Sequence, residues 1–482
     1  MKTNILKTVI LSFFAIMAIW SILTLSISPI VWYDEVFFAS MTHSFAEGNG
    51  LALELDNGSP FYIYGPVYFL FTYISTQIGG FSIFSFRIVN LLFSFGCVGV
   101  LWMIMKIKKN SSIAKYVVAA LFMTDVLFIS NGHSGRMEFV ALFFVLLAYY
   151  YWVKNLNLGY IGIAVSLSLA VMTTPRCVMI AFPLALYYFC KLVKDRNWLK
   201  TGVYVSIPIL LYLIWIYASY GSIDTFIAYF TKSNDVSQNA SLTERFIGGN
   251  FYVPKWNYPL LILFLLSMVI AVWRKQLSKI SLYILPIALF YILVYDTGLY
   301  SVYILPFFLL AIISVYTALS EKDRWIKKTF HVAISICLLI NLSIFSYKSV
   351  ALLATAKSRD YSLVESWLNK RIPENSRVVG SCEYYYACIR HSCSFKKLFR
   401  DYTDDEYVFT DLIENYRPQY LFISTSETKS GSIKNADRFE KKLIGKYRTP
   451  IDCDYPEWLK KLIGNTTQSS YDGNLYEIVY NE

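Results

Sequence analysis

The sequence predicts an all-α protein that crosses a membrane many times and ends in a small soluble α/β domain. Hydrophobic residues make up 56% of the 482 residues and charged residues only 16%, whereas a soluble domain usually carries about 25% charged residues. The character of the chain changes near residue 350, where long apolar runs end and charged residues become frequent. We therefore expect a transmembrane domain at 1–349 and a soluble domain at 350–482.

The net charge of +11 belongs to the membrane part. Residues 350–482 contain 19 Lys and Arg and 19 Asp and Glu, so the whole basic excess lies in 1–349. Basic loops of membrane proteins mark the cytoplasmic side more often than they bind a ligand. The charge therefore gives no reason to expect a nucleic-acid partner.

Apolar runs of about 20 residues, the length of a membrane-spanning helix, predict eleven spans. They fall near 8–29, 83–105, 113–131, 138–153, 158–173, 177–190, 202–220, 257–273, 280–296, 299–318 and 330–348. Basic connections such as "KIKKNSSIAK" alternate with long, acidic or short ones. The positive-inside rule then puts the N-terminus in the cytoplasm and the soluble domain outside. We expect a multi-pass protein of the plasma membrane.

The segment 61–79 is apolar enough to span the membrane but does not fit this alternation. If it crossed the membrane, "KIKKNSSIAK" would lie outside, and every later loop would move to the opposite side of the membrane. Its many tyrosines suit the depth of the membrane interface. We therefore interpret it as a juxtamembrane helix on the outer face, within a large first outer loop at 30–82.

The soluble domain is predicted from alternating helix and strand patterns. An amphipathic helix is expected at 360–376, strands at 377–382, 419–425 and 474–480, and a further helix at 434–447. Four cysteines would lie outside the membrane, where one or two disulfides and free thiols are both compatible with the sequence. They are Cys382, Cys388, Cys393 and Cys453.

Ionisable residues gather at the predicted outer ends of the spans, where a charge without a role is expensive. Asp34 and Glu35 follow the first span, and Arg87 opens the second. Later spans begin on the outside with three more such residues, Arg136, Glu138 and Arg176. Guanidinium groups bind phosphate bidentately, and carboxylates act as bases or metal ligands. This gathering suits a negatively charged lipid-phosphate substrate.

Each of these residues also has a structural explanation. Long basic side chains reach from helix ends to the interface, and an acid can cap the next helix. This explanation fits Arg87 and Arg176 well, and it fits Glu35 about as well as a functional one. It fits Asp34 poorly, because the surrounding "VWYDEVFF" does not form a polar loop.

The order of these features resembles the GT-C glycosyltransferases, membrane enzymes that take a sugar from a polyprenyl-phosphate donor. The branch that it resembles contains the protein O-mannosyltransferases and the lipid A aminoarabinose transferase. The matching pieces are the Asp-Glu pair after the first span, "YGPVYFLFTYIS", "SFRIVNLLFS", "GRMEFVALFFVLLAYYYW", "TTPRCVMIAFPLAL" and "LYSVYILPFFLLA". They cover most of 1–320 in the order expected of the family.

The resemblance implies a set of site residues. Asp34 would be the catalytic carboxylate, with Glu35 beside it and Glu138 as a second acid in the same cavity. The cavity would also include Tyr33, Tyr64, Pro66 and Tyr303. Many relatives carry Lys-Pro-Pro where this chain has Tyr-Gly-Pro, so a phosphate-binding lysine of the family is missing. The donor phosphate would then be held by arginines: Arg136, Arg176, Arg245 and Arg87.

The reaction implied is a single displacement at the outer membrane face. Asp34 would deprotonate or orient an acceptor hydroxyl, which attacks the anomeric carbon and inverts it. Some GT-C enzymes use a divalent metal ion, which Asp34 and Glu138 could ligate here. The donor would be a polyprenyl-phosphate sugar, and the acceptor could be a lipid, a glycan or a protein.

Two other functions remain compatible with the sequence. A transporter or lipid flippase would also place charges in the membrane, and Asp125 lies inside the third predicted span. However, the inward halves of the spans are nearly free of charge, and the two halves show no evident repeat, which many transporters have. A polymerase of lipid-linked glycans would have a large outer loop, but its catalytic arginines would be expected in later loops.

Overall fold

The computed structural model describes most of the chain and divides it into two compact units. The described residues are 2–31, 33–56, 59–60, 64–108, 112–228, 258–293, 299–398, 410, 412–425, 438–450 and 471–480. Unit 1 comprises Met1–Ile22, Tyr62–Leu70 and Val89–Ser346. Unit 2 comprises Leu23–Phe61, Phe71–Ile88 and Tyr347–Glu482. Most of the first outer loop therefore belongs to the same unit as the C-terminal part.

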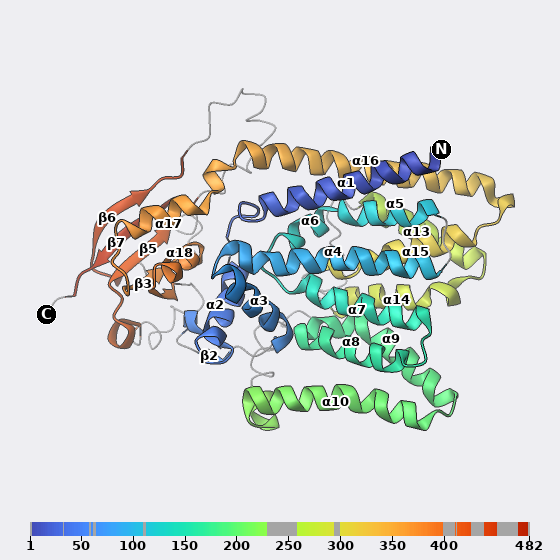
Figure 1. Cartoon of the computed structure of the whole chain (residues 1–482), viewed down its shortest axis with the longest axis horizontal. Helices are drawn as coiled ribbons and strands as arrows, with labels where there is room; N and C mark the ends of the chain where they lie inside the picture. Colours follow the sequence, from blue (N-terminus) through green and yellow to red (C-terminus); the bar gives the residue numbers. More distant parts are fainter. Residues whose placement is uncertain are drawn as a thin grey trace. The chain divides into compact units, whose positions relative to one another are not determined.

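Every predicted span coincides with a helix or a bent pair of helices (Figure 1). In chain order these are α1 (Lys2–Thr24), α4 (Ile83–Ile107), α5 (Ser112–Met123) with α6 (Val126–Gly132), α7 (Glu138–Lys154), α8 (Gly159–Thr173), α9 (Val178–Lys194), α10 (Trp198–Tyr220), α13 (Tyr258–Trp273), α14 (Leu277–Leu293), α15 (Leu305–Ala318) and α16 (Arg324–Ala354). Among the described residues, five helices are long and apolar enough to cross a membrane, or six if the bent pair is one span. The number of eleven crossings stays a prediction.

The helices of unit 1 differ in how much of their surface they bury. Helix α8 packs against α7 and α10, while α14 packs against α9 and α15. Helix α15 is buried along most of its length. Helix α10 instead leaves large apolar side chains exposed, such as Ile209, Leu210 and Ile214. An exposed apolar face of this kind is compatible with contact to lipid.

The third predicted span is bent by 58° between α5 and α6. Asp125 lies at the break as the N-cap of α6, and its carboxylate accepts a hydrogen bond from the Leu127 N–H over 2.8 Å. A carboxylate at this position satisfies an N–H group that has no partner within the helix. The charge inside this span therefore has a structural role.

The segment predicted as the first outer loop, 30–82, contains two helices and a small hairpin. Helix α2 (Tyr33–Ala46) follows α1, and helix α3 (Pro66–Gly79) confirms the helix expected within 61–79. Between them, β1 (Ala52–Leu53) pairs antiparallel with β2 (Ser59–Pro60), and the short helix η1 (Glu54–Asp56) connects the strands. The position of α3 at the outer membrane face stays a prediction.

A five-stranded mixed sheet organises the C-terminal part of unit 2. Its strand order is β4-β3-β5-β7-β6. The strands are β3 (Arg377–Gly380), β4 (Ser394–Lys397), β5 (Tyr420–Ser424), β6 (Lys441–Tyr447) and β7 (Gly473–Ile478), with helices α17 (Tyr361–Asn369) and α18 (Tyr385–Arg390). Strand β3 runs parallel to β4 and β5, and β7 runs antiparallel to β5 and β6. This confirms a helix within 360–376, which ends at Asn369, and the three predicted strands.

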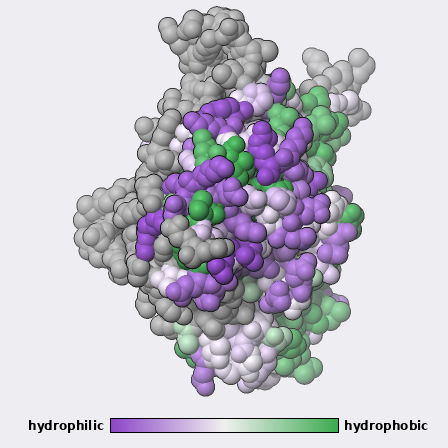
Figure 2. All heavy atoms as spheres, turned by 90° about the vertical axis from the view of Figure 1, so that its left-hand side faces the viewer, coloured by the Kyte–Doolittle hydropathy of each residue, from purple (hydrophilic) through white to green (hydrophobic). Residues whose placement is uncertain are grey.

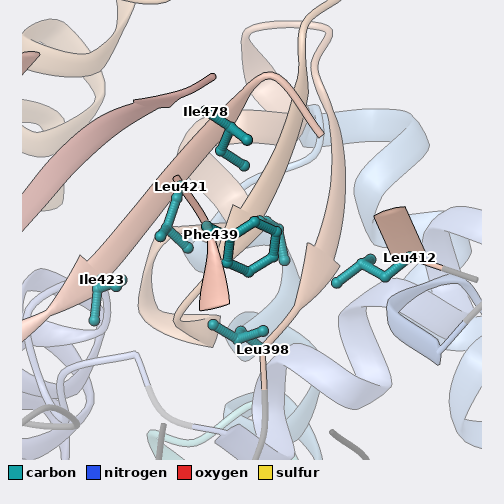
Figure 3. Packing of buried hydrophobic residues seen from close by; sticks show 7 residues of the cluster. Leu398, Leu412, Leu421, Ile423, Phe439 and Ile478 are labelled. Atoms are coloured by element: carbon teal, nitrogen blue, oxygen red, sulfur yellow. The ribbon is translucent and has the colours of Figure 1, made fainter. Parts of the chain in front are cut away.

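The sheet has its own hydrophobic core. Figure 3 shows the packed side chains, which are Val379, Leu398, Leu412, Leu421, Ile423, Phe439 and Ile478. The surface in Figure 2, which looks onto the sheet end of Figure 1, is mainly hydrophilic where residues are coloured. A compact core under a polar surface is typical of a chain segment in water.

The helix expected at 434–447 is wrong in its described part, because Lys441–Tyr447 form strand β6. Lysines along this segment resembled the polar face of an amphipathic helix. The pairing with β7 overrides that local preference. β6 is an edge strand, where exposed lysines also hinder pairing with a foreign strand.

The described cysteines of the C-terminal part are free thiols. Cys382, Cys388 and Cys393 form no disulfide with one another. Burial raises the pKa of the Cys388 and Cys393 thiols, which keeps them protonated. Cys453 lies outside the described residues.

Candidate functional site

A buried ion pair lies at the start of α7. Arg136 precedes the helix, and Glu138 is its first residue. Arg136 Nε donates a hydrogen bond to Glu138 Oε1 over 2.8 Å, and the two side chains are only 3% and 2% exposed. The carboxylate also lies at a helix N-terminus, where negative charge is stabilised. This pairing compensates the cost of removing both charges from water.

Tyr300, in the short helix η4 (Leu299–Tyr303), joins Arg136 to a second guanidinium, that of Arg176. Its hydroxyl accepts a hydrogen bond from Arg136 Nη2 over 3.1 Å and another from Arg176 Nη1. Its ring centroid lies 5.3 Å from Arg136 Cζ and 4.1 Å from Arg176 Cζ. The ring face and the phenol oxygen attract both cations and thereby reduce the repulsion between them. Two guanidiniums that converge on one oxygen match the geometry of a phosphate site.

One carboxylate oxygen of Glu138 has no hydrogen-bond partner in the described part of the chain. Its Oε2 atom is buried and makes no hydrogen bond among the described residues. An unpaired buried acceptor costs about 1–3 kcal/mol, and more for a charged group. Because two guanidinium charges face one carboxylate, the cluster carries a net positive charge. Both features favour binding of an anion that also offers a hydrogen-bond donor.

Two predicted cavity residues belong to the same cluster. Tyr303 is buried within electrostatic reach of Glu138 and Arg176, and Tyr64 interacts electrostatically with Arg176. The glycine after Tyr64 packs against the backbone of α8, since a Cβ atom on Gly65 would lie 1.8 Å from the Met172 carbonyl oxygen. Only glycine fits this close approach.

An apolar cavity of about 680 Å³ extends to the short segment that carries Arg176. It is formed mainly by α8, α9 and α10, and Pro175, the residue before Arg176, lines it. Other lining residues include Val171, Val178, Phe182, Pro208 and Trp215. The volume is typical of ligand sites, and the lining suits an aliphatic chain.

Unit 2 contains a second buried ion pair, between Glu35 in α2 and Arg87 in α4. Arg87 Nε and Nη2 donate to the two carboxylate oxygens over 2.7 and 2.8 Å, and both side chains are fully buried. Arg87 Nη1 also donates to the carbonyl oxygens of Leu25 and Pro29 over 2.9 and 2.8 Å. The pair therefore ties the segment before α2 to the start of that helix, which favours a structural role for both residues.

Asp34 lies beside this ion pair, half-buried in the first turn of α2. Strand β4 brings a cation to the same turn, because Lys397 Nζ lies 4.1 Å from the Phe37 ring centroid and 3.4 Å from Tyr33 Oη. The lysine is only 5% exposed. An anionic group bound at this turn would meet the positive helix N-terminus and the Lys397 charge.

The predicted site residues therefore form two groups. Unit 1 brings together Arg136, Glu138, Arg176, Tyr64 and Tyr303, and unit 2 brings together Tyr33, Asp34, Glu35 and Arg87. Pro66 is the first residue of α3. Arg245 lies outside the described residues. That Asp34 and Glu138 share one cavity stays a prediction.

The sequence analysis missed Tyr300 and Lys397. Tyr300 is the first aromatic in "YSVY", three residues before the predicted Tyr303, so the same segment contained its signal. Lys397 is 364 residues from Tyr33 in the sequence. Nothing local in the sequence indicates that contact.

Comparison with known proteins identifies the fold. No protein-family model and no curated protein matches the sequence. The crystal structure of ArnT from Cupriavidus metallidurans in the apo state matches with a TM-score of 0.63 at 12% identity, over 98% of each chain. The structure of ArnT from the same organism bound to undecaprenyl phosphate matches with a TM-score of 0.63 at 13% identity, over 97% of each chain. The chain has the ArnT fold.

These matches show that the chain has the fold of ArnT, and membership of the GT-C superfamily stays a prediction. The match covers nearly the whole chain, and together with the apolar helices it supports a multi-pass membrane protein. The branch within the superfamily, the orientation of the termini and the division at 349 stay predictions.

Proposed function

We propose that the protein is a membrane glycosyltransferase that moves a sugar from a polyprenyl-phosphate donor to an acceptor hydroxyl at the outer membrane face. The observation that carries this proposal is the pair of guanidiniums, Arg136 and Arg176, together with the 680 Å³ apolar cavity that Pro175 lines next to Arg176 in the sequence. Undecaprenyl phosphate, which one ArnT structure holds, combines a phosphate with a long apolar tail. These two groups match the two parts of the site in chemistry.

The donor binds through both parts. The polyprenyl tail occupies the apolar cavity, where van der Waals contacts with the lining side chains replace its contacts with membrane lipid. The phosphate binds Arg136 and Arg176, and its oxygens replace the Tyr300 hydroxyl as the acceptor between them. As the bond from sugar to phosphate breaks, the guanidiniums stabilise the negative charge that grows on the phosphate.

Asp34 acts on the acceptor. Its carboxylate takes the proton of the attacking hydroxyl, so that the oxygen bonds to the anomeric carbon while the phosphate leaves from the opposite side. A single displacement of this kind inverts the anomeric carbon. Glu35 and Arg87 hold the helix that carries Asp34 and do not contact the substrate.

The structure offers little for a metal ion. Among the described residues, no group of three or more His, Cys, Asp and Glu side chains is placed to hold one. The proposed reaction therefore routes no step through a metal, and positive charge at the phosphate comes from the arginines.

The transport alternative loses its main support. It depended on the intramembrane Asp125, and the structure explains that residue as the N-cap of α6. A capping carboxylate has a structural role at this position that requires no transported substrate.

The proposal is tested by separating donor binding from transfer. The purified protein in lipid nanodiscs is assayed for binding of undecaprenyl phosphate, and for transfer of radiolabelled sugar from polyprenyl-phosphate donors to a native membrane extract. Asp34→Asn should retain binding but lose transfer by about 100-fold or more. Arg176→Met should weaken binding by about tenfold or more, because it removes a charged hydrogen bond.

Two outcomes would contradict the proposal. If the wild-type protein does not bind undecaprenyl phosphate, the donor class is wrong. Equal transfer by wild type and Asp34→Asn would remove Asp34 from the chemistry.

A further inference from the structure

A second cavity, polar and about 600 Å³ in volume, lies within unit 2. Its walls come from the last turn of α2 with His43, the following Glu47, Glu54 of η1, and the segment 389–396 that leads into β4. The volume is in the range of ligand sites. None of the residues assigned above to donor binding or catalysis lines this cavity.

The polar groups of the cavity are held in place by the protein. His43 Nδ1 lies 2.9 Å from Glu54 Oε2, and each of these side chains is about one quarter exposed. Lys396 Nζ donates to the Glu54 carbonyl oxygen over 2.5 Å. The His43 ring packs edge-on against Phe81 at 5.2 Å between centroids. A ligand would therefore meet polar groups that are already oriented, which lowers the entropic cost of binding.

The chemistry of the lining indicates the kind of ligand. Carboxylates only accept hydrogen bonds, an ammonium group only donates them, and the hydroxyls of Ser392 and Ser394 do both. A matching ligand must itself offer donors and acceptors close together, as the hydroxyl groups of a sugar do. Glu47 and Glu54 outweigh the charge of Lys396, so a phosphate is disfavoured. Ile389 and Phe395 add apolar surface for the C–H face of a sugar ring.

The cavity and Asp34 lie at opposite ends of one helix. Asp34 is in the first turn of α2, and His43 is nine residues later in its last turn. At 1.5 Å per residue, the two positions are about 14 Å apart along the helix. A ligand bound in the cavity could extend along α2 to the catalytic carboxylate.

We propose that this cavity binds the carbohydrate part of a glycan or glycolipid acceptor, at a distance from the hydroxyl that receives the new sugar. This inference rests on the proposed transferase function and names the acceptor class for it. Glu54 and Glu47 accept hydrogen bonds from sugar hydroxyls, and Lys396 donates one.

The test changes the cavity without changing the donor site. Glu54→Gln and Glu47→Gln replace carboxylates that line the cavity, and Glu365→Gln is the matched control. Glu365 pairs with Arg390 over 2.7 Å in the same unit but does not line the cavity. The measurements are the native-extract concentration that half-saturates sugar transfer, and the affinity for undecaprenyl phosphate.

We expect both cavity variants to need roughly tenfold more extract for half-saturation, because each loses a charged hydrogen bond to the acceptor. Their affinity for undecaprenyl phosphate should match wild type, and the control should change neither value. Periodate treatment of the extract, which cleaves vicinal diols of sugars, should abolish acceptor activity, whereas protease treatment should not.

Three results would overturn the inference. The first is an unchanged half-saturation in both variants, and the second is a parallel loss of undecaprenyl phosphate affinity in both. The third is an acceptor that survives periodate but not protease, which would make it a protein. Failure of the wild type to bind undecaprenyl phosphate or to transfer sugar would instead refute the proposed function itself.

Discussion

The two buried ion pairs differ in how many of their carboxylate oxygens accept a hydrogen bond. Both oxygens of Glu35 accept hydrogen bonds from Arg87, which also holds two backbone carbonyls. In Glu138, Oε1 is paired with Arg136 while Oε2 has no hydrogen-bond partner among the described residues. A saturated pair, in which both carboxylate oxygens have partners, stabilises the fold. A pair with one unpartnered oxygen can still accept a hydrogen bond from a ligand.

The first prediction concerns the saturated pair. Arg87→Met should lower the free energy of unfolding by about 3–5 kcal/mol, because it leaves the Glu35 charge buried without a partner. Arg390→Met breaks the pair with Glu365, in which the arginine side chain is 49% exposed. This change should lower the free energy of unfolding by about 1 kcal/mol or less. Thermal unfolding in the same detergent compares the two variants. Equal melting temperatures for both would contradict the structural role of Arg87.

The second prediction concerns Tyr300. Tyr300→Phe keeps the ring between the guanidiniums and loses only the oxygen that a phosphate replaces, so undecaprenyl phosphate affinity should fall by no more than about threefold. Tyr300→Ala also loses both cation–π contacts, so the affinity should fall by roughly tenfold or more. Binding assays on both variants check this order. A larger loss in the Phe variant would show that the hydroxyl itself contacts the donor.

For individual residues, the sequence predicted which charged residues lie near one another but not which of them form ion pairs. Arg136, Glu138 and Arg176 were grouped because all begin predicted spans on one side. Arg87 was expected at the phosphate, yet it binds Glu35, which is 52 residues away in the sequence. Pairing across such a separation depends on the packed structure, which local patterns do not contain.

Among the elements, the helices were predictable because their apolar runs are long. The break between α5 and α6 was not, since Thr124 and Asp125 are the only polar residues that interrupt the apolar run from 117 to 129. Strand β6 was mistaken for a helix because its conformation depends on pairing with β7, and not on its own residues.

The third prediction concerns the contact between the turn before α3 and helix α8. Gly65→Ala forces a methyl group against the Met172 backbone, which cannot move as a side chain can, so the cost should be about 1–3 kcal/mol. Gly202→Ala is the control, because a Cβ atom there meets nothing within 4 Å in helix α10. It should leave stability unchanged or raise it by up to about 1 kcal/mol. If both variants melt like wild type, the close contact at Gly65 is absent.

At the scale of the whole molecule, the C-terminal residues pack together with segments near the N-terminus. A separate domain at 350–482 was expected from the change in charge density. In the structure, those residues form one compact unit with Leu23–Phe61 and Phe71–Ile88. The Val31 N–H, for example, donates to the Tyr471 hydroxyl over 3.1 Å.

The fourth prediction follows from this shared unit. A fragment of residues 350–482 expressed alone should not fold, because it lacks the partners that cover part of its core. Co-expression with residues 1–349 should recover it in the membrane fraction. Circular dichroism of the isolated fragment and co-purification of the two pieces check this. A cooperative thermal transition in the isolated fragment would restore the two-domain description.

The contact between Val31 and Tyr471 also sets an order of events during synthesis. The two residues are 440 positions apart, and at about 5–20 residues per second the ribosome needs roughly 20–90 s to make the chain between them. Throughout that interval the first outer loop, with its proposed catalytic carboxylate, lacks the C-terminal half of its unit. A chain that stops before Tyr471 would therefore reach the membrane with this unit unfinished.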